Sequence, residues 1–403
     1  MRDLYSPKLA IGFSCLGHAT MHILVSLFLT IVLALEREWG LGYDELIQLW
    51  TLGTFLIGAG APVAGWLSDR YGEVRLMILF FVGAGLSTIF AGLVEGQAGL
   101  LVALSLLGLF ASIYHPVGMA WAVKNAVGRG KTLAMVGIMG SIGLALASLI
   151  AGGLTEIIGW RSAFIVPGGL SMLAGLALAW LYGSGQVVDR DSDLTPAAPE
   201  THTDLVRAFL ILAITMVLGS LFYTAFTTVL PKWLSADLLS EGTLDTATVG
   251  LLVTVAYLVG ASGQVLGGWL ADRYPLKWVY ALSFAVKIPA MLLAMAVGGW
   301  PVLAVAVIVS FTLDLSGPVE NILLARYSPQ RRRGLVYGLK YVASFAVAPL
   351  GVAMVAWSYR WFDGTATLYL WLAVTAALMF VGALLLPGDR ARVVRAPAPA
   401  AGS

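Results

Sequence analysis

The chain has 403 residues, of which 59% are hydrophobic and only 11% are charged. A soluble domain carries about 25% charged residues, and the mean hydropathy of +0.88 points the same way. This composition excludes an ordinary soluble enzyme, a disordered protein and a secreted disulfide scaffold, and it predicts a polytopic membrane protein. The net charge of +2 argues against nucleic-acid binding. One cysteine, Cys15, permits no internal disulfide, and no Cys/His cluster has metal-ligand spacing, so neither a metal nor a cofactor is expected.

A helix needs roughly 20 mostly apolar residues to cross a bilayer. The first apolar run is too long for the core of a cleavable signal peptide. The sequence predicts an all-α polytopic membrane protein with twelve transmembrane helices. The expected spans are residues 9–35, 46–67, 75–94, 98–123, 132–155, 161–182, 206–230, 247–270, 277–298, 301–325, 335–357 and 366–386.

The longest polar break falls near the middle of the chain and divides the spans into two halves. We expect a first six-helix half at 1–182, a cytoplasmic linker at 183–205, a second six-helix half at 206–387 and a disordered cytoplasmic tail at 388–403. Most of the 24 basic residues fall on the side of both termini and the linker, which the positive-inside rule places in the cytoplasm. The basic residues in the loops on the opposite side are only Arg37, Arg161, Lys232 and Arg360.

The two halves repeat one another. The segment Gly-Trp-Leu-Ser-Asp-Arg-Tyr at 65–71 recurs as Gly-Trp-Leu-Ala-Asp-Arg-Tyr at 268–274, and the Pro-Val pair at 116–117 recurs at 318–319. Similar offsets along the chain indicate one duplication, which predicts two pseudo-symmetric halves related by an axis along the membrane normal.

Residues 65–72, read with this repeat, resemble the signature loop of the major facilitator superfamily. The resemblance covers about residues 8–387 and implies a transporter in the cell membrane that works by alternating access. Tyr114-His115-Pro116 in the fourth span and His18 in the first are similar to features of fosmidomycin-resistance-type drug exporters, although Val117 stands where those relatives carry an acidic residue.

The resemblance implies that the repeated loop is a conformational latch between the halves. Asp69 could meet the positive N-terminus of a neighbouring helix, while the two glycines allow close helix approach and a tight turn. The alternative is a topogenic loop whose arginines pair with lipid headgroups. Glu73 stands where the signature loop of that family usually has a basic residue. The expected gating residues are Gly65, Asp69, Arg70, Gly72, Arg75, Asp272 and Arg273.

Ionisable groups within membrane spans are costly and are therefore candidates for function. In the family fold, the first, fourth, seventh and tenth spans line the central cavity. Each histidine has a structural alternative, a hydrogen bond to a nearby carbonyl. Asp314 is the first choice for a proton carrier, with a buried ion pair to Lys287 or Lys340 as the alternative. The expected residues of a substrate and proton cavity are His18, His22, His115, Asp314, Glu320 and Asn321.

Four further residues are secondary candidates. Lys287 lies in a span that usually packs outside the cavity, which favours structural pairing, and Lys340 could extend to the cytoplasmic interface. Tyr223 belongs to a possible apolar wall in the seventh span, and Gln264 could reach the cavity edge from the eighth.

The function predicted from these observations is proton-coupled export of a small organic solute. The fifth span lacks the Gly-Pro common in exporters and has Ser148-Leu149 before Gly152-Gly153, so an importer or facilitator remains an alternative. An enzyme or a nucleotide-driven pump is not expected, because the sequence contains no catalytic motif and no phosphate-binding loop. The expected partners are the solute, protons and the lipid bilayer, and the expected state is a monomer.

Overall fold

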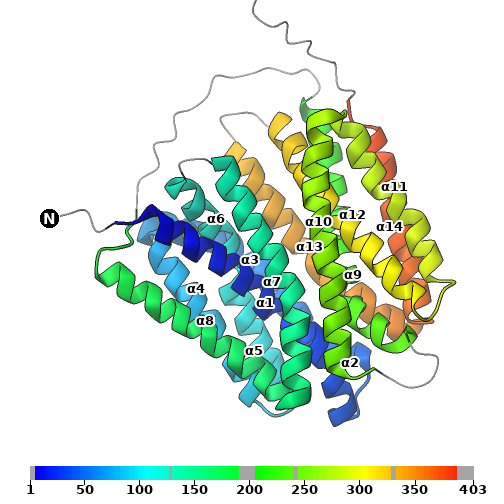
Figure 1. The fold of residues 1–403 in the computed structure, drawn as a ribbon, viewed down its shortest axis with the longest axis horizontal. Coiled ribbons are helices and arrows are strands. Elements are labelled where there is room, and N and C mark those ends of the chain that lie inside the picture. Colours follow the sequence, from blue (N-terminus) through cyan, green and yellow to red (C-terminus); the bar gives the residue numbers. More distant parts are fainter. Residues whose placement is uncertain (1–4, 127–128, 190–204, 239–243, 328–332, 388–403) are drawn as a thin grey trace, which may run out of the picture.

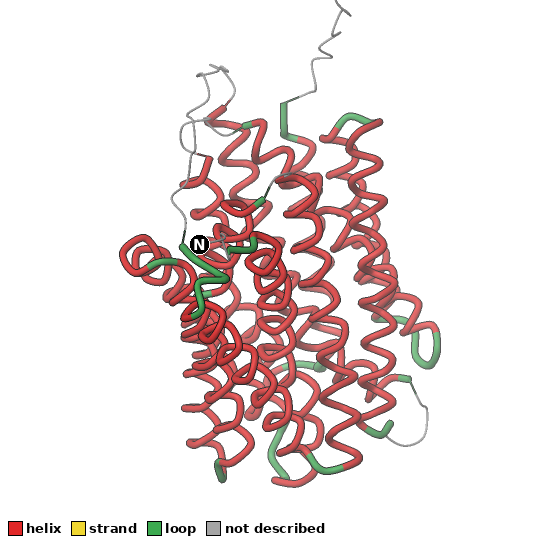
Figure 2. The backbone as a smooth tube through the Cα atoms, turned by 60° about the vertical axis from the view of Figure 1, so that its left-hand side comes forward, coloured by secondary structure: helices red, strands yellow, loops and turns green. Residues whose placement is uncertain are grey.

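The computed structural model of the chain describes residues 5–126, 129–189, 205–238, 244–327 and 333–387. In this part of the chain all regular structure is helical, and twelve segments are long and apolar enough to cross a membrane. Figures 1 and 2 show these segments as a bundle of long helices. The predicted fold class is therefore confirmed. Most of the predicted linker at 183–205, and the whole tail at 388–403, lie outside the described residues.

The first half forms six spans from nine helical segments. Two spans are composite, because α2, η1 and α3 follow one another without a break, and a short turn separates α5 from α6. The segments are α1 (Pro7–Trp39), α2 (Tyr43–Ile47), the 3₁₀-helix η1 (Gln48–Trp50), α3 (Thr51–Tyr71), α4 (Glu73–Leu93), α5 (Gly96–Ala111), α6 (Tyr114–Asn125), α7 (Arg129–Ile157) and α8 (Trp160–Gly183).

The second half forms its six spans from six helices, which lie together on the other side of the bundle (Figure 1). They are α9 (Leu205–Asp237), α10 (Thr246–Arg273), α11 (Leu276–Ala294), α12 (Pro301–Arg326), α13 (Arg333–Trp361) and α14 (Thr365–Leu384).

The break in the fourth span follows from Pro116. Proline has no backbone N–H and cannot bond to the carbonyl four residues earlier, so an α-helix is interrupted one turn before it. The interruption falls at residues 112–113, between α5 and α6. It positions His115 in the first turn of α6, deep in the bundle and 8% exposed.

The two halves meet where small residues allow backbones to approach. A Cβ on Gly250 of α10 would lie 2.2 Å from the carbonyl oxygen of Ser148 on α7, and one on Gly58 of α3 would lie 2.8 Å from the backbone of Phe345 on α13. Neither position accepts a larger residue without separating the helices. These contacts join α7 to α10 and α3 to α13 across the middle of the molecule.

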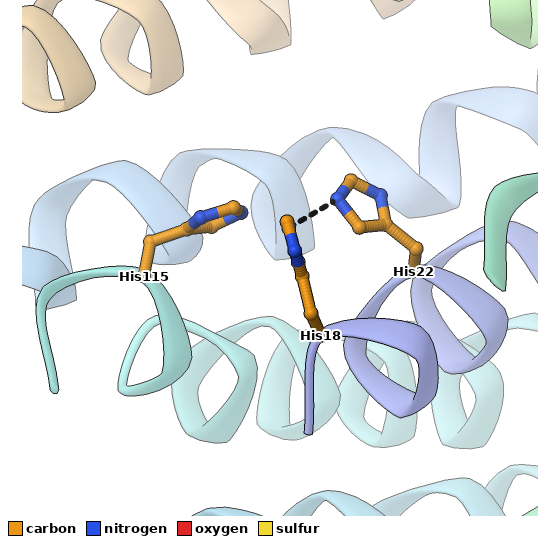
Figure 3. Close-up of side chains that lie close together, drawn as sticks. All are labelled: His18, His22 and His115. Atoms are coloured by element: carbon orange, nitrogen blue, oxygen red, sulfur yellow. Dashed lines mark hydrogen bonds between the residues drawn. The ribbon is translucent and has the colours of Figure 1, made fainter. Parts of the chain in front are cut away.

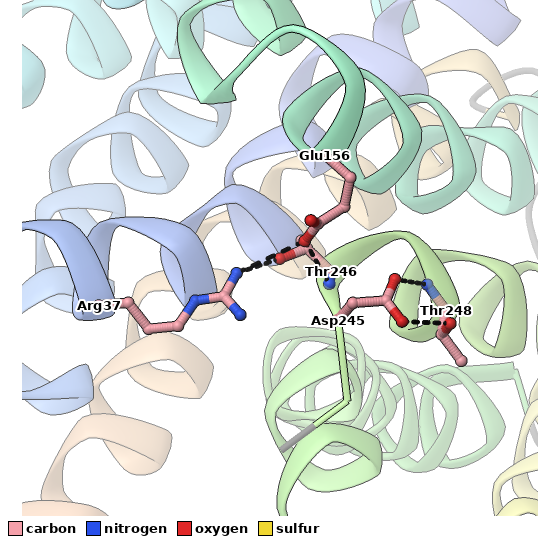
Figure 4. Close-up of polar contacts among 5 residues, drawn as sticks. All are labelled: Arg37, Glu156, Asp245, Thr246 and Thr248. Carbon is pink, nitrogen blue, oxygen red and sulfur yellow. Dashed lines mark hydrogen bonds and ion pairs between the residues drawn. The ribbon is translucent and has the colours of Figure 1, made fainter. Parts of the chain in front are cut away.

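Polar contacts between the halves gather at the end of the bundle opposite the linker, which we call the far end. Lys232 donates to both carboxylate oxygens of Glu36 at 2.7 Å. Arg37 donates to the Thr246 hydroxyl at 2.5 Å and lies 3.7 Å from Glu156, which accepts from the Thr246 N–H at 2.8 Å (Figure 4). Among the described residues, the ion pair that joins the halves is Lys232–Glu36 at this end, whereas Arg37–Glu156 and Glu73–Lys124 lie within the first half. The far-end contacts therefore hold the two halves together.

Candidate functional site

Three histidines come together in the first half (Figure 3). His18 and His22 lie one turn apart on α1, and their Nε2 atoms are 3.2 Å apart. His115 reaches them from α6, with ring centroids 5.3 Å from His18 and 5.8 Å from His22. One ring nitrogen from each residue lies within 4.8 Å of the other two. We call these residues the histidine cluster.

The His18 ring is held on three sides. Its Nδ1–H donates to the carbonyl of Val136 on α7 at 2.7 Å, and Tyr114 stacks on it with an interplanar angle of 19°. Gly140 lies against the ring, and a Cβ there would come within 2.5 Å of it. The hydrogen bond to a neighbouring carbonyl, the structural alternative for this residue, is present. In the neutral ring it leaves the Nε2 lone pair directed at His22, which donates to it.

The second half contains a separate polar network. Gln264 on α10 donates from its Nε2 atom to Asp314 Oδ1 on α12 at 3.0 Å and to the Ser141 hydroxyl of α7 at 2.6 Å. Because α7 belongs to the first half, this amide links a carboxylate of the second half to the opposite half. We call Asp314, Gln264 and Ser141 the carboxylate link. Gln264 was expected only to reach the cavity edge, and Ser141 was not predicted.

Glu320 lies two turns further along α12 and accepts a hydrogen bond from the Tyr280 hydroxyl at 3.1 Å. That hydroxyl also lies 3.1 Å from the Thr215 hydroxyl on α9. Sequence reasoning missed Tyr280 and Thr215, since a tyrosine and a threonine in apolar spans are ordinary packing residues. Asn321, the next residue after Glu320, has an exposed side chain.

Lys287 is fully buried in α11. Its Nζ has no hydrogen-bond partner among the described residues and instead lies 4.9 Å from the ring centre of Phe284 and 5.7 Å from that of Phe222. The ion pair with Asp314, which was one alternative, does not form within 4.0 Å. Tyr223, next to Phe222, is half-buried. The side chain of Lys340 lies outside the described residues.

The repeated loop between α3 and α4 is stabilised differently from the prediction. Asp69 is exposed, and the residue that caps the start of α4 is Asp189 of the predicted linker, whose Oδ1 accepts from the Val74 N–H at 2.8 Å. Gly72 makes the tight turn with φ of +91°, and a Cβ there would lie 2.2 Å from the Asp189 carboxylate. A Cβ on Gly65 would make only an ordinary contact, 3.8 Å from Pro116.

The charged residues of this loop lie on the surface. Arg70 and Arg75 are exposed, each with its guanidinium 5.8 Å from a tyrosine ring centre. In the second copy Asp272 and Arg273 are exposed too, and Arg273 lies over Trp269 at 4.3 Å. Glu73 is buried and forms an ion pair with Lys124 of α6, within the first half.

Comparison with known proteins agrees with this architecture. The sequence profile of the Major Facilitator Superfamily matches residues 14–243 and 212–401. The chain belongs to the major facilitator superfamily. It is accordingly a multi-pass membrane protein and a transporter of small organic solutes, and the family's members are not enzymes.

Relatives with assigned substrates share limited identity with the chain. The D-galactonate transporter of Escherichia coli O6:H1 is 23% identical over 92% of this chain and 96% of its own length. The probable 4-methylmuconolactone transporter of Cupriavidus pinatubonensis is 32% identical, but the match spans 34% of this chain and about a third, 32%, of that protein. A bacterial homologue of the human lysosomal transporter Spinster, solved in an inward-facing, unoccupied conformation, superimposes with a TM-score of 0.76 at 15% identity, covering 96% of this chain and 98% of that one.

Proposed function

We propose that this chain is a proton-coupled secondary transporter, with Asp314 as the proton carrier. The carboxylate link is the observation that supports the proposal. Gln264 donates hydrogen bonds both to Asp314 in its own half and to Ser141 in the opposite half. The proposed proton carrier is therefore hydrogen-bonded to a side chain whose contact with the other half must change when the halves rock. The proton and the conformational change are thereby connected through one side chain.

The energetics of a membrane carboxylate favour this role. A charged carboxylate in the membrane interior is costly, and the cost falls when it accepts a proton or a hydrogen bond. When the halves separate at α7 and α10, Gln264 and Ser141 lose their mutual hydrogen bond. Protonation of Asp314 replaces an acceptor by a hydroxyl donor, which weakens the bond from Gln264 and frees the amide to move.

In this proposal the linker side faces the cytoplasm, as the basic residues indicate. The contacts that join the halves at the far end would then lie on the side away from the cytoplasm, and we infer that the path opens at the other end. The resemblance to drug exporters favours export of a small organic solute as the direction of transport.

A second candidate is transport of an organic acid. One relative, which matches 92% of the chain, is a D-galactonate transporter, and Lys287 offers a buried amino group that has no hydrogen-bond partner among the described residues. A solute carboxylate that approached α11 would form an ion pair with the protonated Lys287 side chain, which would balance the charge of each group. Charge complementarity of this kind would also distinguish acids from neutral solutes.

The test is a flux assay in proteoliposomes with an imposed pH gradient, using D-galactonate as the acidic probe and ethidium as the drug-like probe. We expect Asp314→Asn to abolish flux driven by the pH gradient while the protein remains folded. Glu95→Gln is the matched control, because it makes the same chemical change at an exposed carboxylate and should transport like the wild type. Undiminished pH-driven flux in Asp314→Asn would remove Asp314 as the carrier, and the probe that moves would identify the solute class.

A further inference from the structure

We propose that the histidine cluster is a binding site for one divalent transition-metal ion of the zinc class, with His18, His22 and His115 as ligands. This inference goes beyond the proposed transport function and does not depend on it. His18 and His22 are neighbours on α1, and the packing of α6 against α1 brings the distant His115 to them.

The spacing of the ligand atoms suits such an ion. Metal–nitrogen distances of about 2.0–2.1 Å in a tetrahedral site place the ligand atoms roughly 3.3–3.4 Å apart. His18 Nε2 and His22 Nε2 are already 3.2 Å apart, and the nitrogen of His115 lies within 4.8 Å of both. A change of the His115 rotamer that moves its ring nitrogen by up to about 1.4 Å would therefore complete the set.

The outer contacts of the cluster are those of a metal site. A metal-bound imidazole usually donates its second N–H to a carbonyl or carboxylate, which fixes the tautomer and the ring orientation. His18 donates Nδ1–H to Val136 and keeps Nε2 for the ion. Tyr114 stacks on the ring and Gly140 packs closely against it, so the first ligand is already oriented.

A hydrogen-bonded histidine pair accounts for only part of the arrangement. It explains why Nε2 of His22 faces Nε2 of His18, and edge-on ring packing at 86° and 79° can seat His115 beside them. Neither contact by itself requires one nitrogen of each of the three rings to lie within 4.8 Å of the others, which an ion bound between them would explain.

The ligand set also predicts the chemistry of the ion. Imidazole nitrogens suit Zn²⁺, Cu²⁺ and Ni²⁺, whereas Mg²⁺ and Ca²⁺ prefer oxygen ligands. Among the described residues no carboxylate or thiol joins the three nitrogens. The fourth position is therefore left for water or an anion, as in zinc sites with three protein ligands. An anion is favoured because a buried dication with neutral ligands is costly in a membrane.

The experiment measures metal binding by the full-length protein, purified in detergent with an affinity tag that contains no histidine. Co²⁺ is the probe, since its tetrahedral complexes absorb strongly in the visible, and Zn²⁺ should displace it. We expect one ion per chain and the loss of this absorption in His18→Ala. His115→Gln, which keeps a polar side chain, should weaken binding by more than the roughly 10- to 100-fold that loss of an outer-shell partner costs, because it removes a ligand.

The control is His202→Ala, since His202 is the fourth histidine of the chain and lies outside the described residues. It should bind Co²⁺ like the wild type. Substoichiometric binding by the wild type, or equal binding by folded His115→Gln and His202→Ala, would overturn the proposal. Either result leaves the flux assay of Asp314→Asn unaffected, so failure of the metal site and failure of proton coupling are distinguishable.

Discussion

The histidine cluster and the carboxylate link differ in how they relate to the two halves. All three histidines, and the Val136 carbonyl that orients His18, belong to the first half. Asp314 belongs to the second half but is bonded through Gln264 to Ser141 in the first. A group held within one half keeps its geometry when the halves rock, whereas a link between halves must break or re-form. The cluster is therefore suited to binding, and the link is suited to coupling.

The carboxylate link is not the only contact between the two halves among the described residues. His115 of the cluster lies 5.0 Å from the ring of Phe345 on α13, so one ligand of the proposed metal site touches the second half. This contact is apolar and can slide, while the hydrogen bond from Gln264 has a direction and a length that allow little movement. The His115–Phe345 contact therefore tolerates relative movement of the two halves, whereas the hydrogen bond from Gln264 to Ser141 does not.

The largest effect should follow from Lys287→Met. Methionine fills a similar volume without a polar group, and replacing a buried amine that has no hydrogen-bond partner among the described residues should leave the thermal stability unchanged or raise it. Transport of D-galactonate, by contrast, should fall to background, because the cation proposed for the acid solute is gone. Flux and thermal unfolding measured on the same preparation separate the two effects.

Lys277→Met is the matched control for that variant. Lys277 lies on the same helix and donates to the Leu386 carbonyl at 2.8 Å, at the linker end of the bundle. It should retain transport. If Lys287→Met transported normally with lower stability, the lysine would be structural.

The next effect concerns the cluster and uses two glycines of α7. Gly140→Ala places a Cβ 2.5 Å from the His18 ring, whereas Gly137→Ala meets nothing within 4 Å. Overpacking costs about 1–3 kcal/mol, while alanine in an open helical position gains roughly 0.5–1 kcal/mol over glycine. We expect Gly140→Ala to lower the thermal stability and to weaken Co²⁺ binding.

Gly137→Ala should be as stable as the wild type or more so, and it should bind Co²⁺ normally. Equal behaviour of the two alanine variants in both assays would show that His18 is not held against α7.

Much of this fold is readable from the sequence because apolar runs of spanning length are separated by short polar loops. The twelve predicted spans correspond to the twelve observed ones, with α1 extending a few residues beyond its prediction at both ends. His18 and His22 share one face of α1 because they are four residues apart. The helix breaks before Pro116 because proline has no backbone N–H.

What the sequence did not predict depends on contacts between distant helices. His115 is about a hundred residues from His18, and no local pattern indicates that α6 lies against α1. Gln264 and Ser141 meet only because the halves pack along α7 and α10. Asp189 caps α4 from a segment whose composition predicts only a linker. These pairings come from tertiary packing of helices that are apolar on every face, where periodicity gives no direction.

A smaller effect should follow from loss of the carboxylate link in Gln264→Leu. This change leaves Asp314 and Ser141 without the amide donor, and an unsatisfied buried polar group costs about 1–3 kcal/mol. Ser141→Ala removes only the contact across the halves and should cost about 0.5–1.5 kcal/mol. Unfolding in detergent measures both.

Measurement of pH-driven flux then shows whether the carboxylate link couples proton movement to transport. We expect Ser141→Ala to reduce pH-driven flux more than its modest loss of stability explains. Full flux in that variant would show that the contact between the halves is passive.

The smallest effect should come from Asp245, which belongs to neither site and serves as the reference. It caps α10 by accepting from the Thr248 N–H at 2.8 Å and from the Thr248 hydroxyl at 2.6 Å (Figure 4). These bonds hold the pKa of Asp245 below its usual value. Asp245→Ala should cost about 1 kcal/mol at neutral pH.

The sign of the pH dependence follows from that lowered pKa. The cap contributes stability above the unfolded-state pKa of about 3.9, and the contribution is lost as the pH falls through the folded-state value. The difference in unfolding free energy between the wild type and Asp245→Ala should therefore shrink in acid. Asp245→Asn should keep most of the stability at neutral pH, since asparagine caps helices about as well.

The capping of α4 by Asp189 changes where the two halves are mechanically connected. The chain leaves α8 at Gly183, yet Asp189 is anchored at the turn around Gly72, and only glycine leaves room for its carboxylate there. Residues 184–187 remain bonded to the last turn of α8, and Asp189 adds an attachment to the α3–α4 hairpin. The turn of the repeated loop and the segment that follows α8 thus share one attachment point, so a change at Gly72 would alter both.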